Sequence, residues 1–223
     1  MPESCNEPCE FPSPYYCGEP AMLCPPGSTW SHTCCQCVCK YSPILIDIRG
    51  DSFALTDYER GVRFDLNGNG AKEKLSWTEA GADDAWLALD RDGDGRINNG
   101  RELFGNFTPQ PSSVERNGFF ALAEFDRPEQ GGNGDGVIDV NDSIYASLRL
   151  WQDADHDGVS ATPELHALSS LGVESVSLDY KESRKKDRHG NEFRYRSKVN
   201  GRGRSETGQW AYDVFLLNTP RGN

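Results

Sequence analysis

The sequence predicts an α+β fold, in which EF-hand-like loops and short helices pack with a small antiparallel β-sheet behind a disulfide-rich N-terminal segment. Three observations support this. Four acidic, glycine-bearing segments lie in the middle of the chain, all eight cysteines fall within the first 39 residues, and apolar residues alternate with polar ones from Val173 onward. The predicted units are a cysteine-rich segment over residues 1–42 and a loop-bearing domain over residues 43–223, with its sheet at about 173–218.

Length and charge limit the classes of function. A chain of 223 residues can bury one good core with a small appended module. The net charge of −12 argues against general binding to nucleic acids or membrane surfaces. No hydrophobic run is long enough to span a membrane, and no signal-peptide core follows Met1. We therefore expect any export signal to lie upstream or to have been removed.

The cysteines form one cluster: Cys5, Cys9, Cys17, Cys24, Cys34, Cys35, Cys37 and Cys39. A clustered, even set predicts a small disulfide-linked unit whose connectivity the sequence leaves open, and this requires an oxidising compartment. Zinc binding is the alternative, but paired C-x-x-C motifs are missing and only His32 lies nearby. We therefore expect a secreted or cell-surface protein.

Strands are expected on both sides of the acidic loops. Before the loops they cover Pro43–Ile48, Phe53–Leu55 and Val62–Phe64, and the apolar run Ala85–Leu89 leads into the second loop. After the loops, alternation predicts three strands, marked by Val176, Leu178 and Tyr180, by Phe193 and Tyr195, and by Trp210, Tyr212, Val214 and Leu216. A turn at His189–Asn191 is expected between the first two of these.

Short helices are expected around the loops. They cover Gly100–Phe104, Phe119–Phe125, Val140–Leu150 and a segment from Pro163 to Leu171. The third of these has apolar residues at helical spacing, namely Ile144, Leu148 and Trp151.

Loop four has the most complete ligand pattern for calcium (Ca2+). Aspartates occupy positions 1, 3 and 5, glycine follows at position 6, and a glutamate that can bind through both oxygens stands at position 12. The expected ligands are Asp153, Asp155, Asp157, the carbonyl of Val159, and Glu164. An Asp/Gly-rich solvent turn is the alternative, but such turns rarely hold all these residues in register.

Loop two has the same start, but its distal acid comes one residue late. The expected ligands are Asp90, Asp92, Asp94, the carbonyl of Arg96, and Glu102. Arg101 stands at position 12, and a one-residue bulge at Asn99–Gly100 would absorb the offset.

Loop three lacks an acid at position 1, where Gly131 stands, and Asp126 is available as the missing ligand. Its expected ligands are Asp126, Asn133, Asp135, the carbonyl of Val137, and Asp142. We expect loops three and four to form a face-to-face pair through Val137–Ile138 and Val159–Ser160.

Loop one is the weakest candidate. It offers Asp65, Asn67, Asn69 and Glu73, with only Ser76 at position 12. Two acids predict low affinity, and a plain turn between strands fits equally well.

The order of these motifs resembles a family of secreted bacterial calcium-binding modules. The segments that carry the resemblance are Ser42–Ile48, Gly61–Gly70, Leu87–Ile97, Glu102–Gly105, Asn117–Phe119 and Leu150–Ser160. Together they are similar to the calcium-dependent self-processing modules of RTX-type proteins, over roughly residues 43–180. That family cleaves an Asp-Pro bond through the aspartate's own carboxylate and can pass the acyl group to a lysine. The matching bond here is Ser42–Pro43, and serine has no carboxylate, so the resemblance supports the fold and calcium rather than the reaction.

We interpret the chain as an extracellular structural or recognition module whose folding depends on calcium, in preference to an enzyme. Two alternatives remain open: a calcium-triggered self-processing or cross-linking module, and a dockerin-like assembly module suggested by the 22-residue offset between Gly131 and Asp153. Residues 181–204 carry ten Lys/Arg against three Asp/Glu, which fits either an anionic partner, such as an extracellular protein or polysaccharide, or a solvated hairpin.

Overall fold

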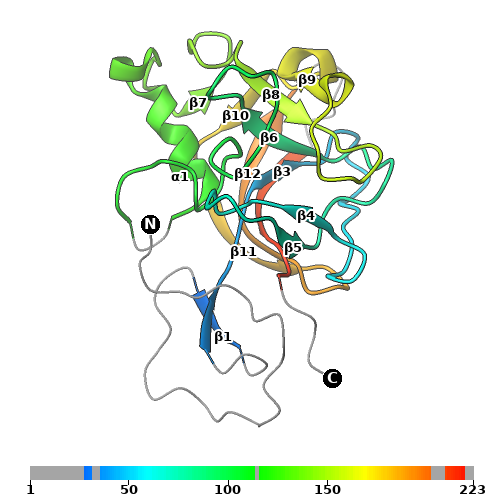
Figure 1. Ribbon diagram of the computed structural model, residues 1–223. Coiled ribbons are helices and arrows are strands. Elements are labelled where there is room, and N and C mark those ends of the chain that lie inside the picture. The colour runs from blue at the N-terminus through cyan, green and yellow to red at the C-terminus, as the bar shows by residue number, and fades with distance from the viewer. Residues whose placement is uncertain (1–27, 32–35, 114–115, 202–208, 219–223) are drawn as a thin grey trace, which may run out of the picture.

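The computed structural model describes residues 28–31, 36–113, 116–201 and 209–218 (Figure 1). Among these residues antiparallel strands dominate, so the predicted α+β fold with helix-flanked EF-hand-like loops is wrong. The described part has one α-helix of six residues, α1 (Gly118–Ala123). Four 3-10 segments accompany it: η1 (Glu124–Asp126), η2 (Pro128–Gln130), η3 (Thr162–Glu164) and η4 (Leu168–Leu171).

The described core is a nine-stranded antiparallel sheet. In spatial order its strands are β7 (Val137–Ile138), β10 (Ser175–Ser177), β12 (Glu192–Asn200), β13 (Gln209–Phe215), β3 (Ile44–Ile46), β6 (Ala85–Leu89), β8 (Leu148–Trp151) and β9 (Leu165–Ala167), and β11 (Lys181–Lys186) pairs with β12. Two hairpins are not hydrogen-bonded into this sheet: β1 (Ser28–Ser31) with β2 (Gln36–Cys39), and β4 (Val62–Phe64) with β5 (Glu73–Leu75). The predicted C-terminal strands therefore belong to the main sheet and not to a separate small one.

At β6 both faces of the sheet are buried, which explains the unbroken apolar run in this strand. Leu87 lies in one hydrophobic cluster with Phe119 and Leu122 of α1. Trp86 lies in the cluster on the other face, which the β4–β5 hairpin covers with residues such as Phe64. A strand that is covered on both sides needs no polar face, so alternation is lost there.

Three tryptophans from distant segments meet on the hairpin side. The ring centroids of Trp77 and Trp86 are 4.7 Å apart, and those of Trp77 and Trp151 are 5.6 Å apart. Because Trp151 ends β8 directly before loop four, this cluster fixes the entry to that loop.

Most of the predicted helices are strands or turns. Within the expected helix 140–150, Leu148 and Leu150 lie opposite Leu89 and Leu87 of β6. Long-range pairing with an apolar strand therefore overrides helical spacing. The expected helix from Pro163 is η3 followed by β9, and Gly100–Phe104 is not helical. The expected helix at Phe119–Phe125 is confirmed in part as α1, and the strands at Pro43–Ile48 and Val62–Phe64 are confirmed as β3 and β4.

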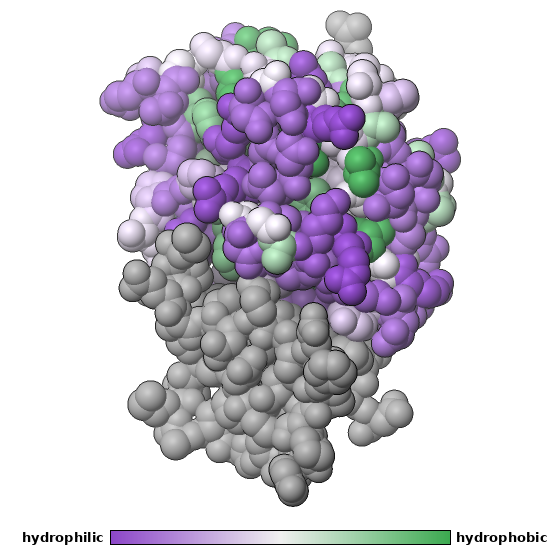
Figure 2. Space-filling view, in the orientation of Figure 1, coloured by the Kyte–Doolittle hydropathy of each residue, from purple (hydrophilic) through white to green (hydrophobic). Residues whose placement is uncertain are grey.

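The surface of the described part is polar on the side that Figure 2 shows, as the high content of charged residues predicts. Figure 2 shows that the described surface on this side is largely hydrophilic, with isolated hydrophobic residues. Among the described residues, no helix combines the length and the hydropathy needed to cross a membrane. The predicted disulfides involve side chains that lie outside the part of the chain that the structure describes.

Candidate metal sites in the acidic loops

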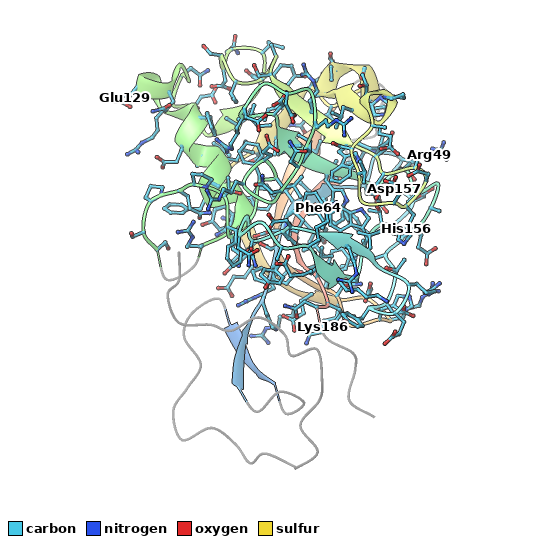
Figure 3. All side chains as sticks on the ribbon, in the orientation of Figure 1. Arg49, Phe64, Glu129, His156, Asp157 and Lys186 are labelled. Atoms are coloured by element: carbon cyan, nitrogen blue, oxygen red, sulfur yellow. The ribbon has the colours of Figure 1, made fainter. Side chains whose placement is uncertain are left out.

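The four acidic loops share one backbone form. At the sixth position Gly70, Gly95, Gly136 and Gly158 have φ of 93°, 82°, 83° and 69°. At the fourth position Gly68, Gly93, Gly134 and His156 have φ of 71°, 78°, 74° and 62°. Glycine adopts this left-handed region without steric cost, which explains its recurrence. His156 is the exception, and its ring nitrogens lie 2.5 Å from the Thr78 carbonyl and 2.7 Å from the Arg60 carbonyl (Figure 3).

In each loop an early aspartate accepts a hydrogen bond from the sixth backbone N–H. The N–O distances are 2.8 Å for Asp65, 2.8 Å for Asp90 and 2.9 Å for Asp153. In loop three, Asp126 does the same for Gly136 at 2.9 Å. Asp126 thus takes the place of the missing first acid, although it precedes Gly131 in the sequence by five residues.

The distal glutamates of loops four and two play equivalent parts. The two carboxylate oxygens of Glu164 accept from Ala154 N at 2.8 Å and Ala161 N at 3.0 Å. Those of Glu102 accept from Arg91 N at 3.1 Å and Asn98 N at 2.7 Å. In both loops these amides belong to the second and ninth positions, so Glu102 spans loop two in spite of its late place in the sequence.

Carboxylate oxygens converge in loops two and four. Asp90, Asp92 and Asp94 each place an oxygen within 4.8 Å of the others, and Asp153, Asp155 and Glu164 do the same. Asp153 is 2% exposed, and burial raises the pKa of its carboxyl against the opposing effect of the hydrogen bonds from Gly158 N and Asp157 N, while the charge of Glu164 adds a smaller increase. Like charges at this separation repel each other most where water is excluded, and a bound cation would remove that cost.

The other predicted ligands have different surroundings. In loop four, Asp157 accepts from Val159 N at 2.7 Å, and both residues are exposed. In loop three, Asp142 accepts from Asn133 N at 3.3 Å and Asp139 N at 2.8 Å, while Asp135 accepts from Asn133 Nδ2 at 2.8 Å.

In loop one, Glu73 accepts from Leu66 N at 3.1 Å and Asn67 Nδ2 at 2.8 Å, and Asn69 accepts from Ala71 N at 2.7 Å. Of the described residues, neither loop one nor loop three contributes a group of three acids as close together as those of loops two and four.

Loop four pairs with loop two and not with loop three. Ser160 Oγ accepts from Ile97 N at 2.6 Å and donates to the Ile97 carbonyl at 3.2 Å. The expected pairing through Val137–Ile138 is wrong, because these residues form β7 and pair with β10. Register within the sheet, which local spacing does not encode, decides which loops meet.

One acidic group escaped the sequence prediction. Asp47, Asp51 and Asp83 place oxygens within 4.8 Å of one another, although Asp83 is distant in sequence. The local signals were Asp47 and Asp51, which flank a glycine-bearing turn, and the adjacent pair Asp83-Asp84, which lies directly before an apolar run.

The Ser42–Pro43 bond lies in a buried polar environment. Ser42 N donates to Asn106 Oδ1 at 3.0 Å, and Asn106 N donates to Ser42 Oγ at 3.2 Å. Nearby Asp213 is fully buried and accepts from Gly118 N at 3.0 Å, and burial raises the pKa of this carboxyl to about 7. The two hydrogen bonds with Asn106 hold Ser42 in a fixed, buried position.

Comparisons with known proteins place the chain in a family. The chain belongs to the SPM domain family, whose profile matches residues 44–216. It is similar to the iron-regulated protein FrpA of Neisseria meningitidis serogroup C, with 37% identity over 154 residues. That alignment covers 68% of this chain and 13% of FrpA, so the chain spans a small part of this relative's length. These two matches support the resemblance to modules of RTX-type proteins that the sequence motifs indicate.

Proposed function

We propose that this SPM-domain chain is a calcium-binding module of an exported bacterial protein, and that calcium stabilises its fold. Loops four and two are the main sites in this proposal, and loops three and one are weaker ones. Residues 1–42 form a separate disulfide-linked unit in the same proposal. In this proposal the module has a structural or binding role, and it binds an extracellular protein or polysaccharide.

The observation that carries the proposal is the convergence of oxygens in loop four. Asp153, Asp155 and Glu164 come together around a turn that is anchored by Trp151 and closed by backbone hydrogen bonds. Glu164 Oε1 accepts one N–H, from Ala154, and keeps a further lone pair for a cation, whereas Glu164 Oε2 accepts from Ala161 N and, at 3.4 Å, from Trp151 Nε1.

The donor set favours calcium over other metals. All the expected ligands are oxygens, and hard oxygen donors suit calcium or magnesium and not zinc or copper. Calcium accepts six to eight ligands in flexible geometry, which fits a turn with several carboxylates and a carbonyl.

Thermal unfolding at fixed ionic strength tests the proposal. We expect saturating calcium to raise the melting temperature, excess chelator to lower it, and magnesium at the same concentration to have a smaller effect, because a ligand that binds only the folded state stabilises it. Melting curves that chelator leaves unmoved would contradict calcium binding.

The same samples separate the self-processing alternative. An intact-mass measurement before and after incubation with calcium reports any cleavage or cross-link. We expect no change in mass, because Ser42 lacks the carboxylate that the family reaction uses. A fragment beginning at Pro43 would favour the enzyme instead.

A further inference from the structure

Two exposed cations of β12, Arg196 and Lys198, lie on an inner strand of the sheet. This strand pairs with β13 on one side and with β10 and β11 on the other. Charged side chains on an edge strand discourage pairing with another chain, but a strand with partners on both sides has no need of such protection. Edge protection therefore accounts for the cations of β11 and leaves those of β12 without an explanation.

The cations of β12 belong to a strip on one face of the sheet. Lys181 of β11 lies directly opposite Arg196, and Trp210 of β13 lies directly opposite Lys198. Residues directly opposite each other, and residues two apart on one strand, share a face of the sheet. We call these four residues, Lys181, Arg196, Lys198 and Trp210, the basic strip.

The charges of the basic strip are largely available to a ligand. The Cζ atom of Arg196 lies 4.6 Å from the centroid of the Trp210 ring, and such a contact orients a guanidinium without using its N–H donors. Among the described residues, no hydrogen bond or ion pair involves the side chain of Arg196 or Lys198, whereas Lys181 pairs with Asp179. Two cations thus stand unpaired in a chain whose net charge is −12.

The surroundings of the basic strip indicate what kind of ligand it fits. The exposed large hydrophobic residues of the described part are Val140 and Val159, and neither belongs to the strip. A protein partner would need apolar anchors of this kind, because they supply most of the energy of protein interfaces. Nucleic acid, with its high charge density, is repelled by the overall negative charge. A hydrophilic polymer with fewer, regularly spaced anions meets neither objection.

We propose that the basic strip binds an acidic polysaccharide through its carboxylates. This inference rests on the proposed function, which gives the module an extracellular partner, and it names the chemistry of that partner. Arg196 donates two parallel N–H groups to one carboxylate while Trp210 supports the guanidinium from behind. Lys198, roughly 6.6 Å further along the strand, neutralises another carboxylate of the polymer. Both contacts are exposed, so salt weakens the binding.

Titration of the full chain in saturating calcium with fluorescently labelled hyaluronate, a linear polymer with a carboxylate on alternate sugars, tests the strip. Neutral dextran and polyglutamate are the comparison polymers. Arg196→Gln and Lys198→Gln each remove one charge from the strip. Arg194→Gln is the matched control, because this exposed arginine of β12 stacks at 4.8 Å on Phe215, which belongs to the hydrophobic cluster of the opposite face.

We expect each strip variant to weaken hyaluronate binding about two- to fivefold, as for exposed ion pairs, and the double variant to weaken it on the order of tenfold. Arg194→Gln should match wild type, and the melting temperature of each variant in calcium verifies that it is folded. Wild-type affinity in the double variant would overturn the proposal. So would dextran bound as tightly as hyaluronate, or polyglutamate bound more tightly.

The same samples separate this proposal from that of calcium binding. If chelator lowers the melting temperature but the strip variants bind hyaluronate like wild type, calcium binding stands and the basic strip fails. If the strip variants weaken hyaluronate binding while chelator leaves the melting curve unmoved, the basic strip stands and calcium binding fails.

Discussion

Loop four and loop two share one backbone pattern but place it in different surroundings. Loop four begins at an almost fully buried Asp153 and is backed by Trp151. In loop two, Asp92 and Asp94 stand in solvent and Asp90 is half-buried. Water and salt screen the exposed carboxylates, whereas burial makes the charges of Asp153 and Glu164 in loop four costly without an ion. Similar sets of ligands should therefore couple calcium to folding strongly in loop four and weakly in loop two.

The largest expected effect comes from Glu164→Gln, with Glu102→Gln as its counterpart in loop two. Glu164→Gln removes a charged ligand from the buried loop, so the tightest site should be lost in a calorimetric titration. A site saturated at a thousandfold excess over its Kd contributes about 4 kcal/mol to folding, and this stabilisation by calcium should disappear.

Glu102→Gln makes the same change at a buried glutamate, but two of the aspartates in its loop, Asp92 and Asp94, are exposed, so the loss of calcium-linked stability should be smaller. Equal losses in the two variants would remove the proposed contrast between the loops. An isotherm of Glu164→Gln that overlays that of wild type would show that loop four is not the tightest site.

The second expected effect is a pH dependence of stability that comes from a buried carboxyl and not from metal binding. Asp213 is a buried carboxyl in the core, outside the acidic loops, and burial raises its pKa to about 7 from 3.8. Between these values the folded protein holds a proton that the unfolded chain releases, so stability falls as pH rises through this window. With chelator present, the wild-type free energy of unfolding should fall by on the order of 2 kcal/mol between about pH 5 and pH 7 relative to Asp213→Asn.

Urea unfolding of both proteins at the two pH values measures this difference. Asp213→Asn cannot titrate at this position, so the component of the slope that belongs to Asp213 should be missing. Parallel pH profiles for the two proteins would mean that Asp213 is ionised in the folded state across the whole range.

Local and long-range features differ in how far the sequence predicts them. The positions of the four loops follow from glycines and acids a few residues apart, and the structure repeats one backbone form at all four. The helix expected over residues 140–150 was wrong. Its apolar residues have helical spacing in the sequence, but Leu148 and Leu150 pair with β6 in space. The group at Asp47 and Asp83 was missed for the same reason, since only the β3–β6 register joins the two.

The smallest expected effect concerns the link between the two compared loops. Ser160 is 2% exposed, and its hydroxyl satisfies both the N–H and the carbonyl of Ile97. Ser160→Ala leaves two buried polar groups without their partner, so unfolding in saturating calcium should require about 1–2 kcal/mol less. Ser170→Ala is the control, because its exposed hydroxyl bonds only the nearby Ala167 carbonyl and should change little.

The same variant also tests whether the loops bind independently. If the Ser160–Ile97 contact transmits order from the buried loop to the exposed one, Ser160→Ala should weaken calcium binding at loop two while loop four keeps its affinity. Titrating Ser160→Ala in the Glu164→Gln background separates the two: there the loss at loop two should vanish, because no filled loop four remains to support it. An undiminished loss in that background would assign the effect to the serine's local packing and leave the two loops energetically separate.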